Sequence, residues 1–104
     1  MTSYIVKFHV GQIIEHKKFG YRGVIYDVDA EFAGTEIWYN QVAKSRPPKD
    51  EPWYHVLVDG SDATTYVAEQ NILTTDNTAE INHPLIEVYF LNFSSDHYNL
   101  GLKQ

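Results

Sequence analysis

The strongest pattern of hydrophobic positions lies in the middle of the chain, over residues 52–59. The run Pro52-Trp53-Tyr54-His55-Val56-Leu57-Val58-Asp59 is rich in aromatic and β-branched residues, which favours a strand over an amphipathic helix. A turn at 60–62 and a Thr-Tyr-Val run at 65–67 complete the pattern of a β-hairpin, expected over 53–59 and 64–68. Alternation places two sets of side chains on opposite faces: Tyr54, Val56 and Val58, and Trp53, His55 and Leu57. Both faces are largely apolar, so each needs a covering element.

Two further strands are predicted before this hairpin. Phe8 to about His16 and Tyr21 to Asp29 are joined by a turn at 17–20, where Gly20 supplies an unusual backbone angle. Gly23 indicates a bulge or sharp bend within the second strand. Alternation in that strand puts Val24, Tyr26 and Val28 on one face, and Ile25, Asp27 and Asp29 on the other.

Helices are expected at two places. Thr35 can cap a helix over Glu36 to Lys44, and a single helical turn fits within 68–73. After His83-Pro84, the spacing of Ile86, Tyr89, Phe90 and Phe93 favours a helix over 84–93, with a strand as the alternative. The proline-rich segment 45–52 predicts an extended linker, and 74–82 a polar loop. Residues 94–104 are expected to be irregular, with 1–7 and 99–104 peripheral.

These elements predict a mainly β fold. Four or five short strands with bends and one or two short helices are typical of a small SH3-like β-barrel. A chain of 104 residues predicts one domain, residues 1–104, with a core of limited size. Association with further copies is a common way to bury more surface.

Composition narrows the class of protein. The chain has no cysteine, which excludes disulfides and thiolate metal sites. The first residues lack the apolar segment of a secretory signal, and no stretch approaches the roughly 20 apolar residues that cross a bilayer. We therefore expect a cytoplasmic protein without a membrane partner.

The net charge of −6 is unevenly distributed. Residues 1–49 carry seven basic and five acidic side chains, whereas residues 50–104 carry one basic and nine acidic ones. Because DNA affinity comes mainly from cations against phosphates, only the first half could bind DNA. The candidate contacts are Lys17, Lys18, Tyr21 and Arg22 near the first hairpin turn, and Lys44, Arg46 and Lys49 near the linker. The alternative is that these are ordinary solubilising residues, and no element that could enter a DNA groove is evident.

No catalytic or metal-binding motif is present in the sequence. The five histidines lack the spacing of a metal site, and we expect His55 to be partly buried and hydrogen-bonded. Asp27 and Asp29 lie on one face, about 7 Å apart. Such a pair could do acid–base work or bind a hard cation, but a solvated strand edge is the commoner meaning. We therefore predict no enzyme, no metal and no cofactor.

Aromatic residues are abundant, with two Trp, eight Tyr and five Phe. Exposed aromatic patches mark partner surfaces, so we predict a partner or oligomer surface at Trp38, Trp53, His55 and Leu57. The alternative is that the helix at 36–44 or the last helix covers these side chains within one chain.

Four blocks in order carry a family resemblance. They are Phe8-x-x-Gly11 with His16; Gly20-Tyr21-x-Gly23-Val24-Ile25 with Asp29; Pro52 to Val58 with Thr65 to Asn71; and His83-Pro84. Together they span roughly residues 7–98 and resemble the heat-shock protein HspQ family, also called YccV-like or hemimethylated-DNA-binding-protein-like.

The resemblance implies an SH3-like barrel that forms a homo-oligomer, with a trimer favoured. It further implies a cytosolic heat-shock factor that helps an ATP-dependent protease degrade particular proteins, including the replication initiator. The alternative function is a DNA-binding protein that prefers hemimethylated sites. A rise in proteolysis without DNA binding indicates the first function, and tight, salt-dependent binding of hemimethylated duplex indicates the second.

Overall fold

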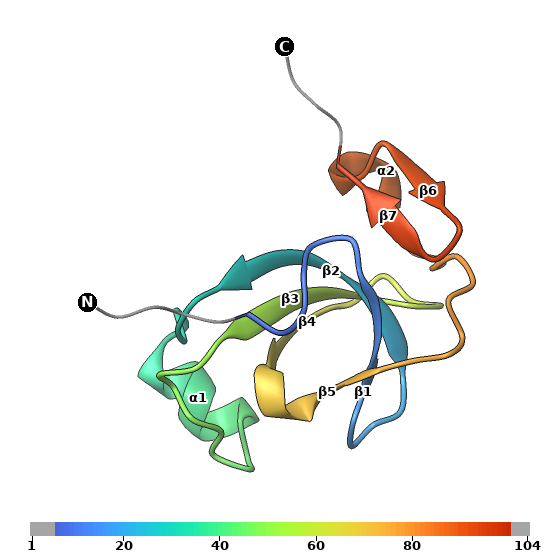
Figure 1. The fold of residues 1–104 in the computed structure, drawn as a ribbon. Helices are drawn as coiled ribbons and strands as arrows, with labels where there is room; N and C mark the ends of the chain where they lie inside the picture. Colours follow the sequence, from blue (N-terminus) through green and yellow to red (C-terminus); the bar gives the residue numbers. More distant parts are fainter. Residues whose placement is uncertain (1–5, 101–104) are drawn as a thin grey trace.

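The computed structural model describes residues 6–100 and has a mainly β, antiparallel fold with two helices (Figure 1). Five strands form one sheet in the order β4-β3-β2-β1-β5, and two more form a separate hairpin, β6-β7. The strands are β1 Ile13–His16, β2 Arg22–Asp29, β3 Trp53–Val58, β4 Thr64–Ala68, β5 Ile72–Thr74, β6 Asn92–Ser94 and β7 His97–Asn99. The helices are α1 Glu36–Val42 and α2 Ile86–Tyr89, with a 3-10 turn at Glu69–Asn71.

The large sheet curves so that its two edges, β4 and β5, are joined by the short turn Glu69–Asn71 (Figure 1). β4 pairs with β3 and β5 pairs with β1, and these two edge strands are not paired with each other. The prediction of a mainly β fold is therefore confirmed. The sheet is not closed, so the SH3-like barrel is not confirmed.

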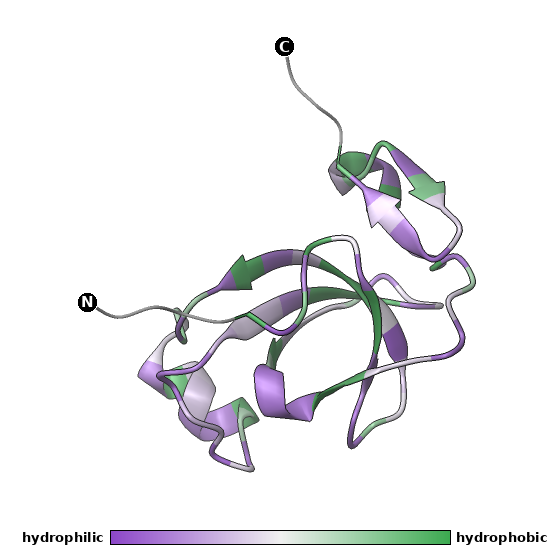
Figure 2. Cartoon of the chain, in the orientation of Figure 1, coloured by the Kyte–Doolittle hydropathy of each residue, from purple (hydrophilic) through white to green (hydrophobic). Residues whose placement is uncertain are grey.

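Both faces of β3 are buried, as the sequence predicted. Tyr54 and Val56 pack with Ile14 and Ile25 in one cluster, whereas Leu57 belongs to a second cluster on the opposite face. The carboxy-terminal segment covers that second cluster with Ile81, Phe90 and Tyr98. Trp53 packs against α1 in a third cluster, with Tyr39, Ala43 and Ala68. Figure 2 shows hydrophobic residues along the curved sheet and a hydrophilic turn at 69–71.

A β-bulge corrects the predicted alternation in β2. The register between β2 and β3 shifts between Ile25 and Asp27, so the side-chain period is interrupted there. Beyond the bulge, Val28 packs with the Ile25 cluster, and Asp27 lies opposite His55. The predicted faces of Val28, Asp27 and Asp29 were therefore wrong, because one extra residue exchanges the two faces.

Gly23 has a packing role and does not form the bulge. A Cβ atom at this position would lie 2.5 Å from Cγ1 of Val56 and 2.6 Å from the carbonyl oxygen of Leu57. Only glycine lets β2 approach β3 this closely.

The two ends of the described chain differ most from the prediction. The first strand begins at Ile13, because Gly11 turns the chain with a φ of 92°. Only Ile86–Tyr89 is helical within 84–93, and residues 92–99 form the β6-β7 hairpin. Burial of Phe90 and Tyr98 against the sheet outweighs the helical spacing of this segment. Residues 1–5 and 101–104, predicted to be peripheral, lie outside the described residues.

Two local predictions for the helical regions are confirmed. The Oγ1 atom of Thr35 accepts a hydrogen bond of 3.1 Å from the backbone N–H of Trp38, so Thr35 caps α1. The expected single turn after β4 is the 3-10 turn Glu69–Asn71. Within residues 6–100, no helix is both long and apolar enough to cross a membrane.

Candidate functional site

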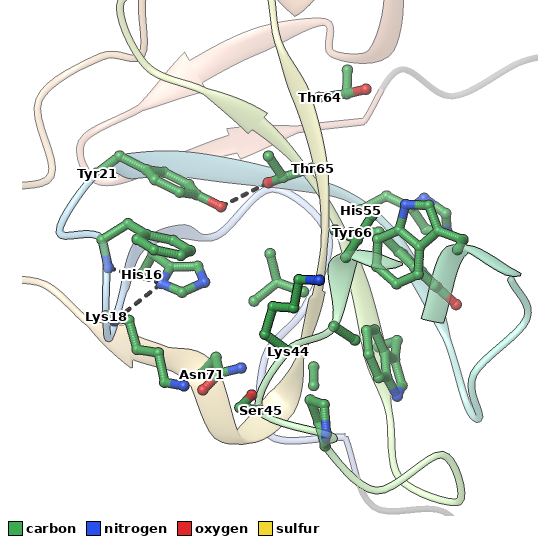
Figure 3. Close-up of a pocket in the computed structure, with 18 of the residues that line it drawn as sticks. His16, Lys18, Tyr21, Lys44, Ser45, His55, Thr64, Thr65, Tyr66 and Asn71 are labelled. Carbon is green, nitrogen blue, oxygen red and sulfur yellow. Dashed lines mark hydrogen bonds between the residues drawn. The ribbon is translucent and has the colours of Figure 1, made fainter. Parts of the chain in front are cut away.

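A groove of about 500 Å³ runs along the edge strand β4 (Figure 3). We call it the β4 groove. Its floor is β4 itself, Thr64–Ala68. One wall is the turn between β1 and β2, with His16, Lys18, Phe19 and Tyr21. The other wall includes Trp38, Val42, Lys44, Ser45 and Pro47, from α1 and the loop after it.

His16 organises the first wall. Its Nδ1 atom accepts hydrogen bonds from the backbone N–H groups of Lys18 and Phe19, at 3.0 and 3.1 Å. The exposed Phe19 ring stacks on the imidazole, with 4.6 Å between centroids. Burial, and then the charge of Lys18, lower the pKa of His16 below 6.5. The imidazole is therefore neutral at pH 7 and carries its proton on Nε2, on the ring edge that faces the groove in Figure 3.

Tyr21 ties this wall to the floor of the groove. Its hydroxyl and Oγ1 of Thr65 share a hydrogen bond of 2.8 Å (Figure 3). Burial raises the pKa of Tyr21, and the bond to Thr65 opposes that effect only in part. The phenol therefore stays neutral, and the turn is held against β4.

The second wall rests on a cluster of aromatic rings. The Tyr66 ring lies 5.2 Å from Trp53 and 5.6 Å from Trp38 between centroids, and Phe32 packs edge-on against Trp53 at 4.9 Å. The Nε1 atom of Trp53 donates to the carbonyl oxygen of Pro48 at 3.0 Å. This packing fixes the half-buried Trp38 at the rim of the groove.

A polar network joins β2, β3 and β4 beside these rings. Oδ2 of Asp29 accepts hydrogen bonds from the hydroxyl of Tyr66 at 2.7 Å and from Nε2 of His55 at 2.9 Å. Burial alone would raise the pKa of Asp29, but the bonds from Tyr66 and His55 outweigh it and lower this pKa. Burial, and then the bond to Asp29, raise the pKa of Tyr66. The network thus keeps an ionised carboxylate beside a neutral phenol.

The predicted carboxylate pair comes together with a histidine. One ligand atom from each of Asp27, Asp29 and His55 lies within 4.8 Å of the others, at the surface. These three side chains are the ones that could hold a hard cation within the described residues. Asp29 already accepts two hydrogen bonds, and Oδ1 of Asp27 accepts one from the backbone of Val28 at 2.9 Å. The two bonds of Asp29 connect β2 with β3 and β4, so these side chains already have a structural role without a cation.

The β4 groove carries an unusual charge for this chain. Its described lining residues include two lysines, Lys18 and Lys44, and no aspartate or glutamate. The whole chain has a net charge of −6. The groove therefore favours a partner with negative charge and apolar groups.

The four residues predicted as a partner surface separate into two pairs. Trp38 and His55 line the β4 groove and are half-buried. Trp53 is 1% exposed and Leu57 is 0% exposed, so both belong to the core of this chain. Trp53 also borders the groove, but α1 covers nearly all of its side chain, and the carboxy-terminal segment covers Leu57.

The residues predicted to contact DNA do not form one surface. Lys18 and Tyr21 line the β4 groove together with Lys44, whereas Lys17 is exposed beside it. The side chain of Arg22 does not line the β4 groove. Its guanidinium pairs with Asp59 at 3.0 Å and donates to the carbonyl oxygens of Asn77 and Ala79.

Arg46 and Lys49 are engaged within the linker region. Arg46 donates to Oδ1 of Asn40 at 2.7 Å and lies over the ring of Tyr39. Lys49 pairs with Glu36 and also lies over Tyr39, with 4.3 Å from Nζ to the centroid. Both side chains therefore stabilise the 45–52 linker against α1.

Several groove residues were missed by the sequence reasoning. Thr64, Thr65 and Tyr66 form the floor, and Phe19 is 76% exposed at the rim. The alternation of β4 gave no sign of its edge position, which depends on the sheet order. The sequence held one signal for this surface, a phenylalanine that follows two lysines in a turn, where a side chain is usually exposed.

Comparison with known families shows a match over most of the chain. The model of the family described as "YccV-like: Hemimethylated DNA-binding protein YccV like" matches residues 6–97. The match takes in all five strands of the large sheet, α1 and α2, and therefore the whole β4 groove.

Proposed function

Since this chain belongs to the YccV-like family, we propose that it is a small cytosolic stress-response protein that acts as a protease adaptor. It would bind particular proteins and promote their degradation by an ATP-dependent protease. An adaptor needs a recognition surface and no reaction centre of its own. The observation that supports this proposal best is the β4 groove, in which aromatic and cationic side chains surround an open strand edge.

DNA binding with a preference for hemimethylated sites is the second candidate, and the description of the family favours it. Lys17, Lys18 and Lys44 are exposed and make no ion pair within residues 6–100. Arg22 and Lys49, in contrast, pair with Asp59 and Glu36. The cations left for phosphates are therefore few, which is why we rank this function second.

Self-association, with a trimer favoured, forms part of the proposal. The carboxy-terminal segment exposes four large apolar side chains, Val88, Tyr89, Leu91 and Leu100. A small domain that leaves such groups exposed gains burial by associating with copies of itself. Sedimentation of the purified chain tests this part separately from the adaptor role.

Protein half-lives in growing and heat-stressed cells test the adaptor role. Cells with and without the gene are compared after protein synthesis is stopped, and a purified protease then degrades the affected proteins with or without the chain. We expect a small set of proteins to live longer without the chain, and the purified chain to speed their degradation. Unchanged half-lives across the proteome would reject the adaptor role.

A gel shift tests the second candidate directly. Hemimethylated, fully methylated and unmethylated duplexes of one sequence are compared over a range of salt concentrations. Submicromolar, strongly salt-dependent binding that prefers the hemimethylated duplex would favour DNA recognition as the function.

A further inference from the structure

We infer that the β4 groove binds an extended acidic peptide segment, which pairs with β4 as an added strand. The inference rests on the proposed adaptor function, because the segment would belong to a protein delivered for degradation. It names the chemical class of the partner and the atoms that recognise it.

The hydrogen-bond pattern shows which backbone groups of β4 are available. Bonds from Val58 N to Ala63 O, at 3.1 Å, and from Glu69 N to Pro52 O, at 3.0 Å, mark two bonded positions at the ends of the β3–β4 pair. Bonded and non-bonded pairs alternate in an antiparallel ladder. The register therefore makes Thr65 and Val67 the bonded residues of β4.

The other three residues of β4 direct their backbone groups away from β3. These are Thr64, Tyr66 and Ala68, and all three line the β4 groove. Within residues 6–100, no hydrogen bond outside the helices and strands reaches the backbone N–H or C=O groups of Thr64 and Tyr66, or the N–H of Ala68. The C=O of Ala68 is used, because Ala68 is the N-cap of the 3-10 turn Glu69–Asn71 and accepts its first bond. The groove floor thus offers donors and acceptors at every second residue, which is the pattern that an added strand requires.

This edge lacks the usual protection against pairing. Exposed edge strands commonly carry a charged residue, a proline or a bulge that discourages an added strand. The β4 sequence, Thr-Thr-Tyr-Val-Ala, contains no charge and no proline, and its pairing with β3 is regular. The opposite edge strand, β5, has only three residues. β4 is therefore the edge suited to a peptide.

The groove walls define the side chains of that peptide. Lys18 and Lys44 stand on opposite walls, and the N–H of His16 adds a donor on one of them. Carboxylates on the peptide would meet these groups, and apolar side chains would meet Phe19 and Trp38. A nucleic acid would meet the same cations, but it has no backbone that matches the open groups of β4.

A defined peptide provides the first test. Acetyl-Glu-Val-Glu-Tyr-Glu-Val-Glu-amide is titrated into the full chain, with binding followed by NMR and amide hydrogen exchange. We expect binding that weakens with salt and slower exchange at Thr64, Tyr66 and Ala68. The same peptide with alternate backbone nitrogens methylated, and a version with lysine for glutamate, should each bind at least tenfold more weakly.

Three outcomes of this titration would overturn the inference. One is binding without protection of those amides. The second is tighter binding of a thymidine oligonucleotide than of the peptide. The third is slow exchange of the same amides before any peptide is added, caused by pairing with a second copy of the chain that the peptide does not displace.

A pair of substitutions at one position tests strand addition independently. Thr64→Pro removes an outward-facing N–H without removing a bond of the β3–β4 ladder, whereas Thr64→Ala retains that N–H. We expect Thr64→Pro to weaken peptide binding about tenfold relative to Thr64→Ala. Equal affinities would contradict pairing along β4. If Thr64→Pro does not fold, Lys44→Glu serves instead, with an expected loss of about tenfold for the acidic peptide.

The peptide test and the half-life test can fail separately. If the chain shortens protein half-lives but the peptide does not protect β4, the adaptor role stands and this inference is rejected. If the peptide pairs with β4 but half-lives do not change, the inference stands and the adaptor role is rejected.

Discussion

The hydroxyl of Tyr66 donates a hydrogen bond of 2.7 Å to Oδ2 of Asp29, which connects β4 to the end of β2 across the intervening strand β3. The same hydroxyl accepts a hydrogen bond of 2.9 Å from the backbone N–H of Ala33, and the same carboxylate binds His55. One phenol therefore holds the floor of the β4 groove, its aromatic wall and the chain leading to α1 in fixed positions.

Loss of this hydroxyl should destabilise the fold. Tyr66→Phe removes one bond to Asp29 and leaves the N–H of Ala33 without its acceptor, so we expect a loss of about 1–3 kcal/mol in the free energy of unfolding. Urea denaturation measures it. Tyr89→Phe is the control, because Tyr89 is 38% exposed. Equal stabilities of the two variants would show that the network contributes little.

The stability of the chain should depend on pH through His16. Its pKa is lowered in the folded state, so below the ordinary value of 6.5 the unfolded chain binds a proton that the folded chain does not. This contribution to stability is complete above 6.5 and is lost as the pH falls towards the lowered pKa.

The matched variants for this prediction are His16→Gln and His9→Gln. We expect the unfolding midpoint of the parent chain and of His9→Gln to fall as the pH drops from about 7 to about 5, and that of His16→Gln to change less. His9 is exposed, which makes it a suitable control. NMR titration of the His16 ring measures its pKa directly, and a value above 6.5 would refute the assignment.

Substitution of Gly23 should be more costly than substitution of Gly20. An added methyl at Gly23 would collide with Val56 and with the backbone of Leu57, so Gly23→Ala should cost about 1–3 kcal/mol or more. Gly20 has open space around it but a φ of 73°, so Gly20→Ala should cost only the backbone strain, about 1–2 kcal/mol. Thermal unfolding compares the two, and a milder effect at Gly23 would contradict the close strand approach.

Arg22 should behave as a structural residue, although its position in the sequence suggested a DNA contact. Arg22→Gln removes the pair with Asp59 and the bonds to Asn77 and Ala79, so we expect about 1–3 kcal/mol of destabilisation. Faster amide exchange at Asn82, whose N–H binds Asp59, should accompany it. Lys17→Gln, in the same turn region, should change neither quantity. If Arg22→Gln is as stable as the parent chain, Arg22 again becomes a candidate for contact with DNA.

The elements predicted well are those with strong local signals. The run of apolar residues at 53–58, the turn after it and the Thr35 cap each depend on neighbours in the sequence, and each is found where expected. The bulge between Ile25 and Asp27 has no such signal, because it is defined by the register with β3. It therefore exchanged the predicted faces of the residues that follow.

The site was predicted only in part, because it depends on long-range assembly. Lys18 and Tyr21 come from one hairpin, Trp38 from α1 and Tyr66 from β4, and only the sheet order places them around one groove. Trp53 and Leu57 show the opposite effect. They lie on the face of β3 that alternation predicted, but α1 and the carboxy-terminal segment pack over that face and bury both side chains.

Two neighbouring lysines provide the most direct test of the account. Lys18 lines the β4 groove and Lys17 does not, although both are exposed cations of the same turn. The measurement is the degradation rate of an affected protein by the purified protease, with the parent chain, Lys18→Glu or Lys17→Glu added in equal amounts. We predict that Lys18→Glu loses at least half of the stimulation and that Lys17→Glu retains it. Equal loss in both variants, or full stimulation by Lys18→Glu, would contradict the β4 groove as the functional surface.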